Sequence, residues 1–100
     1  MRKVKTRPRR VSASAARRIW YVYILRCADD SFYTGITNDV DGRIRAHNRG
    51  KGAAYTRGRR PVKMVYLEKK PSKGSALSRE YAIKKMTRSL KETLASTKSR

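Results

Sequence analysis

Residues 20–37, WYVYILRCADDSFYTGIT, decide how this chain folds. Aromatic and β-branched residues fill two runs, residues 19–26 and residues 32–37, whose side chains would alternate between the two faces of a strand. The polar residues 28–31 between the two runs are typical of a turn. The stretch therefore predicts a β-hairpin, against which the later elements must pack.

Two tyrosines of this hairpin, Tyr23 and Tyr33, lie on one face only if the turn has a particular form. A plain two-residue turn pairs Tyr23 with Ile36 and sends the two rings to opposite faces, because a shift of one residue moves every side chain of a strand to the other face. A type I turn followed by Asp30 in the left-handed conformation adds one residue and restores a common face. A site that uses both tyrosines therefore predicts a bulged turn.

A short helix is predicted over residues 40–48, directly after the hairpin. Asp39 can accept a hydrogen bond from a backbone N–H of the first turn, as an N-cap residue does. Arg43 and His47 are four residues apart, so they share one face of this helix. A lone histidine on a short helix is more often a surface or partly packed residue than a catalyst, so the spacing alone assigns His47 no role.

Residues 50–61 form a Gly- and Arg-rich connection, and a third strand is predicted after it. The connection is too polar for a core and suits contact with a phosphate backbone. Residues 62–67 alternate, with Met64 and Tyr66 expected on one face of the strand. Pro71 ends the strand, because proline has no N–H for a ladder hydrogen bond.

A single long helix is predicted from Ser72 or Ser75 to about Leu94. Its apolar stripe, at helical spacing, consists of Ala76, Ile83, Met86, Leu90 and Leu94. Glu80 falls on the edge of that stripe, so its carboxylate is expected to be half-buried and to face the sheet. The simplest role for Glu80 is an ion pair with Lys84, four residues further on. A second role is that of the one carboxylate in a magnesium site.

The composition is strongly basic. The 100 residues carry 27 Lys and Arg against 7 Asp and Glu, which is a formal net charge of +20. Nucleic acid is the partner that such a charge favours, because a polyanion relieves the self-repulsion. The alternative is a basic surface that only aids solubility. A chain of this length suits one domain with a small core.

Cysteine usage and hydropathy indicate a cytoplasmic protein. Cys27 is the single cysteine, so no intrachain disulfide is possible and a reducing compartment is the simpler interpretation. The longest apolar run, residues 19–25, is too short to span a bilayer, so no membrane association is expected. The N-terminus also lacks the apolar core and cleavage site of a secretory signal.

Residues 1–18 are predicted to be a disordered basic arm. They are rich in Arg and Lys, contain no acid, and hold too little apolar surface to offset their conformational entropy. An organellar transit peptide has a similar composition and is the alternative. The folded domain is then expected over residues 19–95, with a frayed tail over residues 96–100.

No Ser-His-Asp set, Walker-type phosphate loop or Cys-His metal spacing is present in the sequence. A different group of residues, spread along the chain, carries a resemblance. It consists of Tyr21-Val22-Tyr23, Tyr33-Thr34-Gly35, then Arg43 and His47, and finally Glu80. In its order and spacing this group resembles the GIY-YIG nuclease superfamily, and most of all its small stand-alone, YhbQ-like members. The segment of residues 55–61 is also typical of those members.

This resemblance implies a fold and a mechanism. The fold is α+β, a three-stranded antiparallel sheet flanked by helices. The family cleaves nucleic-acid phosphodiesters with one divalent ion, Mg²⁺ or Mn²⁺, and with no small-molecule cofactor. The resemblance implies that Glu80 binds the metal and that Arg43 steadies the scissile phosphate. It further implies that Tyr33 shapes the nucleophile side, that Tyr23 is the general base and that His47 assists. A phenol needs neighbouring cations to ionise at neutral pH, so the basic surroundings are expected to lower the pKa of Tyr23.

The expected function is a divalent-metal-dependent DNA endonuclease of DNA repair or processing, in the bacterial cytoplasm and in association with the nucleoid. The alternative is a nucleic-acid-binding protein without turnover that uses the same basic surface. The residues expected to contact nucleic acid are Arg45, Lys51, Tyr55, Arg57, Arg59, Arg60 and Lys84.

Overall fold

Strand β1 (Trp20–Arg26) lies at the centre of a three-stranded antiparallel sheet with the order β2-β1-β3. Its neighbours are β2 (Phe32–Thr37) and β3 (Lys63–Lys70), so the predicted α+β fold and sheet are confirmed. The structure, a computed structural model, describes residues 19–97. The predicted arm of residues 1–18 lies outside the described residues, as do the last three residues of the predicted tail.

The hairpin has the bulged turn that a shared tyrosine site requires. Asp30 adopts the left-handed conformation, with φ of 73°, and its N–H donates to the Cys27 carbonyl oxygen at 2.8 Å. The register pairs Tyr23 with Gly35, and two residues further along it pairs Leu25 with Tyr33. Side chains two residues apart on a strand share a face. Tyr23 and Tyr33 therefore lie on the same side of the sheet, as predicted.

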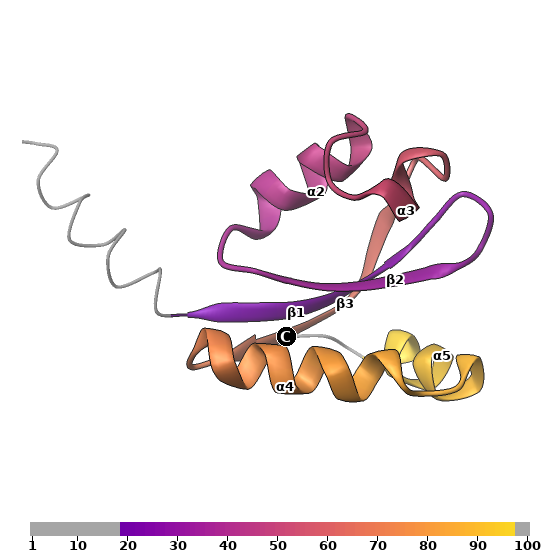
Figure 1. Ribbon diagram of the computed structural model, residues 1–100. Helices are drawn as coiled ribbons and strands as arrows, with labels where there is room; N and C mark the ends of the chain where they lie inside the picture. Colours follow the sequence, from indigo (N-terminus) through magenta and orange to yellow (C-terminus); the bar gives the residue numbers. More distant parts are fainter. Residues whose placement is uncertain (1–18, 98–100) are drawn as a thin grey trace, which may run out of the picture.

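Two helices cover that side of the sheet (Figure 1). Helix α2 (Val40–Asn48) has the predicted bounds, and the side chain of Asp39 caps it by accepting from the Gly42 N–H at 3.2 Å. The Gly- and Arg-rich connection contains a further short helix, α3 (Ala54–Arg57), that the sequence analysis did not predict. The core under these helices is formed by Tyr23, Leu25, Cys27 and Val62, with Tyr33, Ile44, Met64 and Leu67 packed around it.

The opposite side of the sheet is covered by α4 (Lys73–Lys84) and α5 (Arg88–Ser96), so the prediction of one long helix is wrong. The side chain of Thr87 accepts from the Leu90 N–H at 3.2 Å and begins α5 as its N-cap. The break takes Leu90 out of the predicted apolar stripe, because it is 53% exposed, whereas Leu94 still packs on the core. Two short helices can follow the twisted sheet more closely than one straight helix of the same length.

A β-bulge in β3 changes which of its side chains face each core. Tyr66 lies opposite Ile24, whereas Met64 lies opposite Leu25, so Val65 is the extra residue. Met64 packs on the α2 side and Tyr66 on the α4 side, so the prediction that they share a face is wrong. One inserted residue reverses the alternation beyond it.

Within the described residues, no helix has the length and apolar character needed to cross a membrane.

Candidate active site

Tyr23 and His47 meet in the layer between the sheet and α2. The Tyr23 hydroxyl oxygen lies 3.0 Å from Nε2 of His47, and both side chains are buried. Tyr23 comes from the central strand and His47 from the last turn of α2, where the apolar contact of Ile44 with the core turns this face of the helix inward. The lone histidine is thus a fully buried partner of a tyrosine and not a surface residue.

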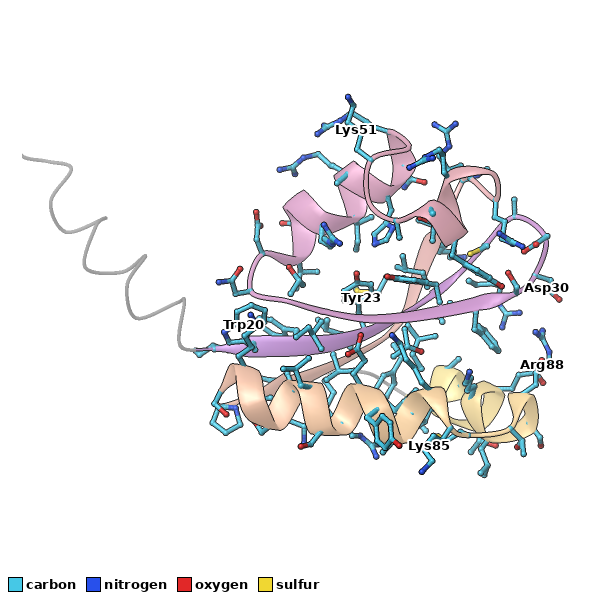
Figure 2. The ribbon with its side chains drawn as sticks, in the orientation of Figure 1. Trp20, Tyr23, Asp30, Lys51, Lys85 and Arg88 are labelled. Atoms are coloured by element: carbon cyan, nitrogen blue, oxygen red, sulfur yellow. The ribbon has the colours of Figure 1, made fainter. Side chains whose placement is uncertain are left out.

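Gly35 allows the Tyr23 ring to lie across the neighbouring strand. A Cβ at residue 35 would stand 2.5 Å from the Tyr23 hydroxyl oxygen and 2.7 Å from the ring carbon that carries it. No real Cβ approaches so closely, so any other residue at this position would displace the ring. The group that approaches this glycine is thus the Tyr23 side chain, which lies between the sheet and α2 (Figure 2).

A second hydrogen bond holds His47 from its other side. Nδ1 of His47 lies 2.8 Å from the hydroxyl oxygen of Thr56, which has no exposed surface, and Thr56 in turn donates to the Ala53 carbonyl oxygen at 3.2 Å. The sequence analysis gave Thr56 no role, because a lone threonine in a polar connection has no periodicity. One sequence signal could have identified Thr56. In a segment composed mainly of Gly, Arg and Lys, a threonine is one of the few residues suited to burial.

Arg43 lies beside this pair and also holds the loop that follows α2. Its Nη2 donates to the Gly52 carbonyl oxygen at 3.1 Å, and the side chain is half-buried. A guanidinium has several N–H groups, so this one bond leaves donors that a phosphate can accept from. The Arg43 side chain also acts on the Tyr23 hydroxyl in the direction that lowers its pKa, so the predicted neighbours Arg43 and His47 are brought together with Tyr23.

A row of aromatic rings runs from the buried pair to the surface. The Tyr33 ring packs edge-on against His47, with centroids 5.2 Å apart, and stacks on Tyr55, with centroids 6.0 Å apart. The guanidinium of Arg59 then lies 3.9 Å from the Tyr55 ring centroid. Tyr55 is partly exposed, so the row links the buried Tyr23–His47 pair to a surface with an aromatic ring and an arginine. Such side chains can stack on the bases of a nucleic acid.

The electrostatics keep both members of the Tyr23–His47 pair neutral at neutral pH. Burial raises the pKa of Tyr23, and Tyr33 and Glu80 add to that rise, while Arg43 acts against it. Burial lowers the pKa of His47, and the charge of Arg43 lowers it further. Arg43 acts on the Tyr23 pKa in the expected direction, but desolvation outweighs it, so the pKa of Tyr23 is raised overall.

Glu80 lies in the other layer, on the helix that covers the opposite side of the sheet from Tyr23 (Figure 1). This helix, α4, packs against β1 and β2. The Glu80 side chain is 17% exposed, so it is largely buried, somewhat more than the predicted half. Its Oε2 lies 3.3 Å from Nζ of Lys84, so the simple ion pair weighed in the sequence analysis is present. Its charge also contributes to the raised pKa of Tyr23. Among the described residues, the ion-pair partner of Glu80 is therefore Lys84, and its link to Tyr23 is through charge alone.

The one carboxylate available suits a metal ion that is bound partly by the protein and partly by the substrate. Over residues 19–97 there is no group of three or more His, Cys, Asp or Glu side chains that could hold a metal. Mg²⁺ commonly binds to one or two carboxylates and completes its coordination with water and phosphate oxygens. Glu80, a single hard oxygen donor of low exposure, fits that pattern.

The residues expected to contact nucleic acid fall into separate groups. Tyr55, Arg57, Arg59 and Arg60 lie on α3 and the turn after it, at the surface end of the aromatic row. Arg59 also forms an ion pair with Asp29 at 3.0 Å. Lys84 lies on α4 beside Glu80, and Arg45 is exposed on α2. Lys51 points away from Tyr23, at the outer end of the α2 and α3 layer (Figure 2).

Proteins similar to this chain include several members of the UPF0213 group. A UPF0213 protein of Clostridium perfringens is 61% identical over 79 residues, which cover 79% of this chain and 85% of the relative. A UPF0213 protein of Haloquadratum walsbyi is 55% identical over 75 residues, which cover 75% and 84%. The solution NMR structure of a UPF0213 protein from Bacillus halodurans has a TM-score of 0.51 and 52% identity, over 78% of this chain and 83% of that one.

The family model described as the GIY-YIG catalytic domain matches residues 19–94. These residues include both tyrosine motifs, the α2 pair of Arg43 and His47, and Glu80. The resemblance found in the sequence is thereby confirmed over residues 19–94. The chain therefore belongs to the GIY-YIG catalytic domain family, and within it to the UPF0213 group.

Proposed function

We propose that this protein is a divalent-metal-dependent endonuclease that hydrolyses DNA phosphodiester bonds, in DNA repair or processing in the bacterial cytoplasm. The observation that carries the proposal is the buried Tyr23–His47 hydrogen bond with Arg43 beside it. Burying two titratable side chains costs free energy that an apolar pair would not. A buried titratable pair at the inner end of an aromatic row supports a site of proton transfer.

The geometry of the three groups supports the following roles. Arg43 binds the scissile phosphate with the N–H groups that do not donate to Gly52, and it stabilises the charge that develops there. Tyr23 takes a proton from the attacking water and gives its own to His47, whose Nε2 is 3.0 Å away. Tyr33 packs on His47 and limits the access of bulk water to the pair.

Glu80 would hold one Mg²⁺ or Mn²⁺ ion together with phosphate oxygens of the substrate. Such an ion supplies charge stabilisation at the phosphate and at the leaving oxygen. Lys84 is paired with Glu80 and is 52% exposed, so it can turn toward solvent or DNA when the carboxylate changes partner. This exchange would make metal binding depend on the substrate.

A second function is supported by that same ion pair. If Glu80 only neutralises Lys84, the protein is a nucleic-acid-binding protein without turnover. The net charge of +20 and the exposed end of the aromatic row support DNA binding under either function, and both predict binding that weakens steeply with salt.

A cleavage assay separates the two functions. Purified protein is incubated with branched, single-stranded and duplex DNA and with Mg²⁺ or Mn²⁺, beside the variant Glu80→Ala. Glu92→Gln is the matched control, because Glu92 is an exposed carboxylate on α5 that pairs only with Arg88 among the described residues. Cleavage that Glu80→Ala abolishes and Glu92→Gln retains supports the enzyme. Cleavage of no substrate, or equal cleavage by Glu80→Ala, leaves the binding function.

A further inference from the structure

Thr56 is the one member of this buried cluster that has no part in the proposed function. Its hydroxyl has no exposed surface and lies 2.8 Å from Nδ1 of His47. It comes from α3, a helix of four residues that follows a loop of mostly small residues. A buried hydroxyl needs hydrogen-bond partners nearby. Whether Thr56 donates to His47 or accepts from it determines which ring nitrogen carries the His47 proton.

The hydrogen bonds of Thr56 indicate a direction for each bond in the cluster. A hydroxyl has one proton, and that of Thr56 is directed to the Ala53 carbonyl oxygen, which can only accept, at 3.2 Å. With its proton on that bond, Thr56 accepts from His47, and Nδ1 carries the imidazole proton. A neutral imidazole has one N–H, which leaves Nε2 with its lone pair directed at the Tyr23 hydroxyl, 3.0 Å away. The buried ring is neutral at neutral pH, because burial lowers its pKa.

The backbone around Thr56 holds the ring in place. A Cβ at residue 52 would overlap Nδ1 and Cγ of His47, so the glycine backbone lies directly on the ring. Arg43 donates to the carbonyl oxygen of that same glycine at 3.1 Å and ties the loop to α2. The imidazole is therefore confined on its Nδ1 side by Gly52 and Thr56, and Nε2 faces only the tyrosine side of the cluster.

We propose that Thr56 is a positioning residue that holds His47 in its Nδ1–H tautomer, so that Nε2 is the acceptor of the Tyr23 phenolic proton. This inference rests on the proposed function of Tyr23 as general base. Without the Thr56 hydroxyl, nothing else among the described residues hydrogen-bonds Nδ1. The proton is then free to move to Nε2, and a protonated Nε2 donates to Tyr23 and cannot accept from it.

The proton path that this tautomer permits is balanced. As the water oxygen forms its bond to phosphorus, a water proton passes to the Tyr23 oxygen and the phenolic proton passes to Nε2 of His47. The phosphorus bond to the leaving oxygen breaks, its electron pair stays on that oxygen, and the oxygen takes a proton from solvent. His47, now an imidazolium, returns the Nε2 proton through Tyr23 to solvent after the products leave.

The tautomer can be measured without any cleavage, because the chain has one histidine. Nitrogen-15 NMR of the labelled imidazole in the full chain at neutral pH should show a protonated Nδ1 and an unprotonated Nε2. Thr56→Ser should keep this spectrum, since it keeps the hydroxyl. Thr56→Val, which has nearly the same shape without the hydroxyl, should move the proton wholly or partly to Nε2.

The kinetic arm uses the same proteins. Thr56→Val should lower kcat roughly 100-fold with little change in KM, the low end of what a proton-transfer group contributes, and Thr56→Ser should restore most of it. Wild-type protein with its proton on Nε2 overturns the proposal even if Thr56→Val fails to fold. Equal kcat for the Val and Ser variants also overturns it. Absence of cleavage by the wild type overturns the proposed nuclease function instead, and the spectra still decide the tautomer.

Discussion

The side chain of Asn48 makes two hydrogen bonds to the backbone of one residue, Val62. Its Oδ1 accepts from the Val62 N–H at 2.7 Å, and its Nδ2 donates to the Val62 carbonyl oxygen at 3.3 Å. The last residue of α2 thus pairs with the chain just before β3 as a neighbouring strand would. This contact ties the helix that carries His47 to the sheet that carries Tyr23.

Asn48→Ala should therefore destabilise the fold. It leaves the partly buried N–H and carbonyl of Val62 without these partners, which costs about 1–2 kcal/mol of the free energy of unfolding. Urea denaturation followed by circular dichroism measures the change. Asn38→Ala is the control, because Asn38 is exposed before α2. Equal midpoints for the two variants would contradict the structural role of Asn48.

Gly35→Ala should reduce cleavage while leaving DNA binding nearly intact. The added Cβ displaces the Tyr23 ring, and a misplacement of about 1 Å at a reacting group lowers the rate on the order of 100-fold. Gly58→Ala is the matched control, since a Cβ there meets nothing within 4 Å. Single-turnover cleavage and a salt titration of DNA affinity give the two readouts. A Gly35→Ala protein with normal single-turnover rates would show that the ring position is unimportant.

Tyr23→Phe should remove the proton acceptor and keep the ring. Cleavage is expected to fall roughly 100- to 10,000-fold, the range of general acid–base catalysis, with unchanged affinity for DNA. The variant also leaves Nε2 of the buried His47 without its partner, so a stability loss of about 1 kcal/mol should accompany it. Tyr81→Phe controls for the loss of a phenol, because Tyr81 is 65% exposed. Normal cleavage by Tyr23→Phe would exclude this residue as the base.

The carboxylate of Glu68 predicts how stability depends on acid. It accepts hydrogen bonds or ion pairs from Tyr66, Lys70 and Arg79 at 2.7–3.0 Å. Burial alone would raise the pKa of Glu68, but these three partners outweigh it and hold the pKa at about 2, below the ordinary value of 4.5. A pKa lowered by folding stabilises the protein above the ordinary value, and this contribution is lost as the pH falls toward 2.

The variant Glu68→Gln should lose that contribution, on the order of 2–3 kcal/mol, at neutral pH. Its stability should also fall less steeply than that of the wild type between pH 4.5 and pH 2, since the titrating group is gone. Denaturant midpoints measured across this range test both expectations, with Glu92→Gln on exposed α5 as the control. Parallel pH profiles for wild type and Glu68→Gln would mean that Glu68 titrates alike in the folded and unfolded chains.

The hairpin and α2 could be predicted because each rests on a local signal. Asp30 tolerates the left-handed conformation that a bulged turn needs, and Asp39 caps the helix that follows. The requirement that Tyr23 and Tyr33 share a face then selected the turn. Local turn chemistry and one functional constraint together fixed the register.

The break between α4 and α5 could not be predicted, because the apolar stripe continues through it at helical spacing. Thr87 competes with that stripe as an N-cap, and packing on a twisted sheet decides between them. The bulge at Val65 has no sequence signal of its own, since Met64, Val65 and Tyr66 are all good strand residues. Both features depend on contacts distant in sequence.

Tyr23 and Thr56 lie on elements that differ in their resistance to local opening. β1 is paired on both sides, so its amides should exchange with solvent deuterium only when the whole domain unfolds. Thr56 lies on α3, which has four residues and whose N-cap residue, Ala53, cannot cap it with its side chain, so α3 should open far more often. Tyr23 therefore stays in position while the hydrogen bond between Thr56 and His47 breaks and forms again. On warming, the proton path should therefore fail before the fold does.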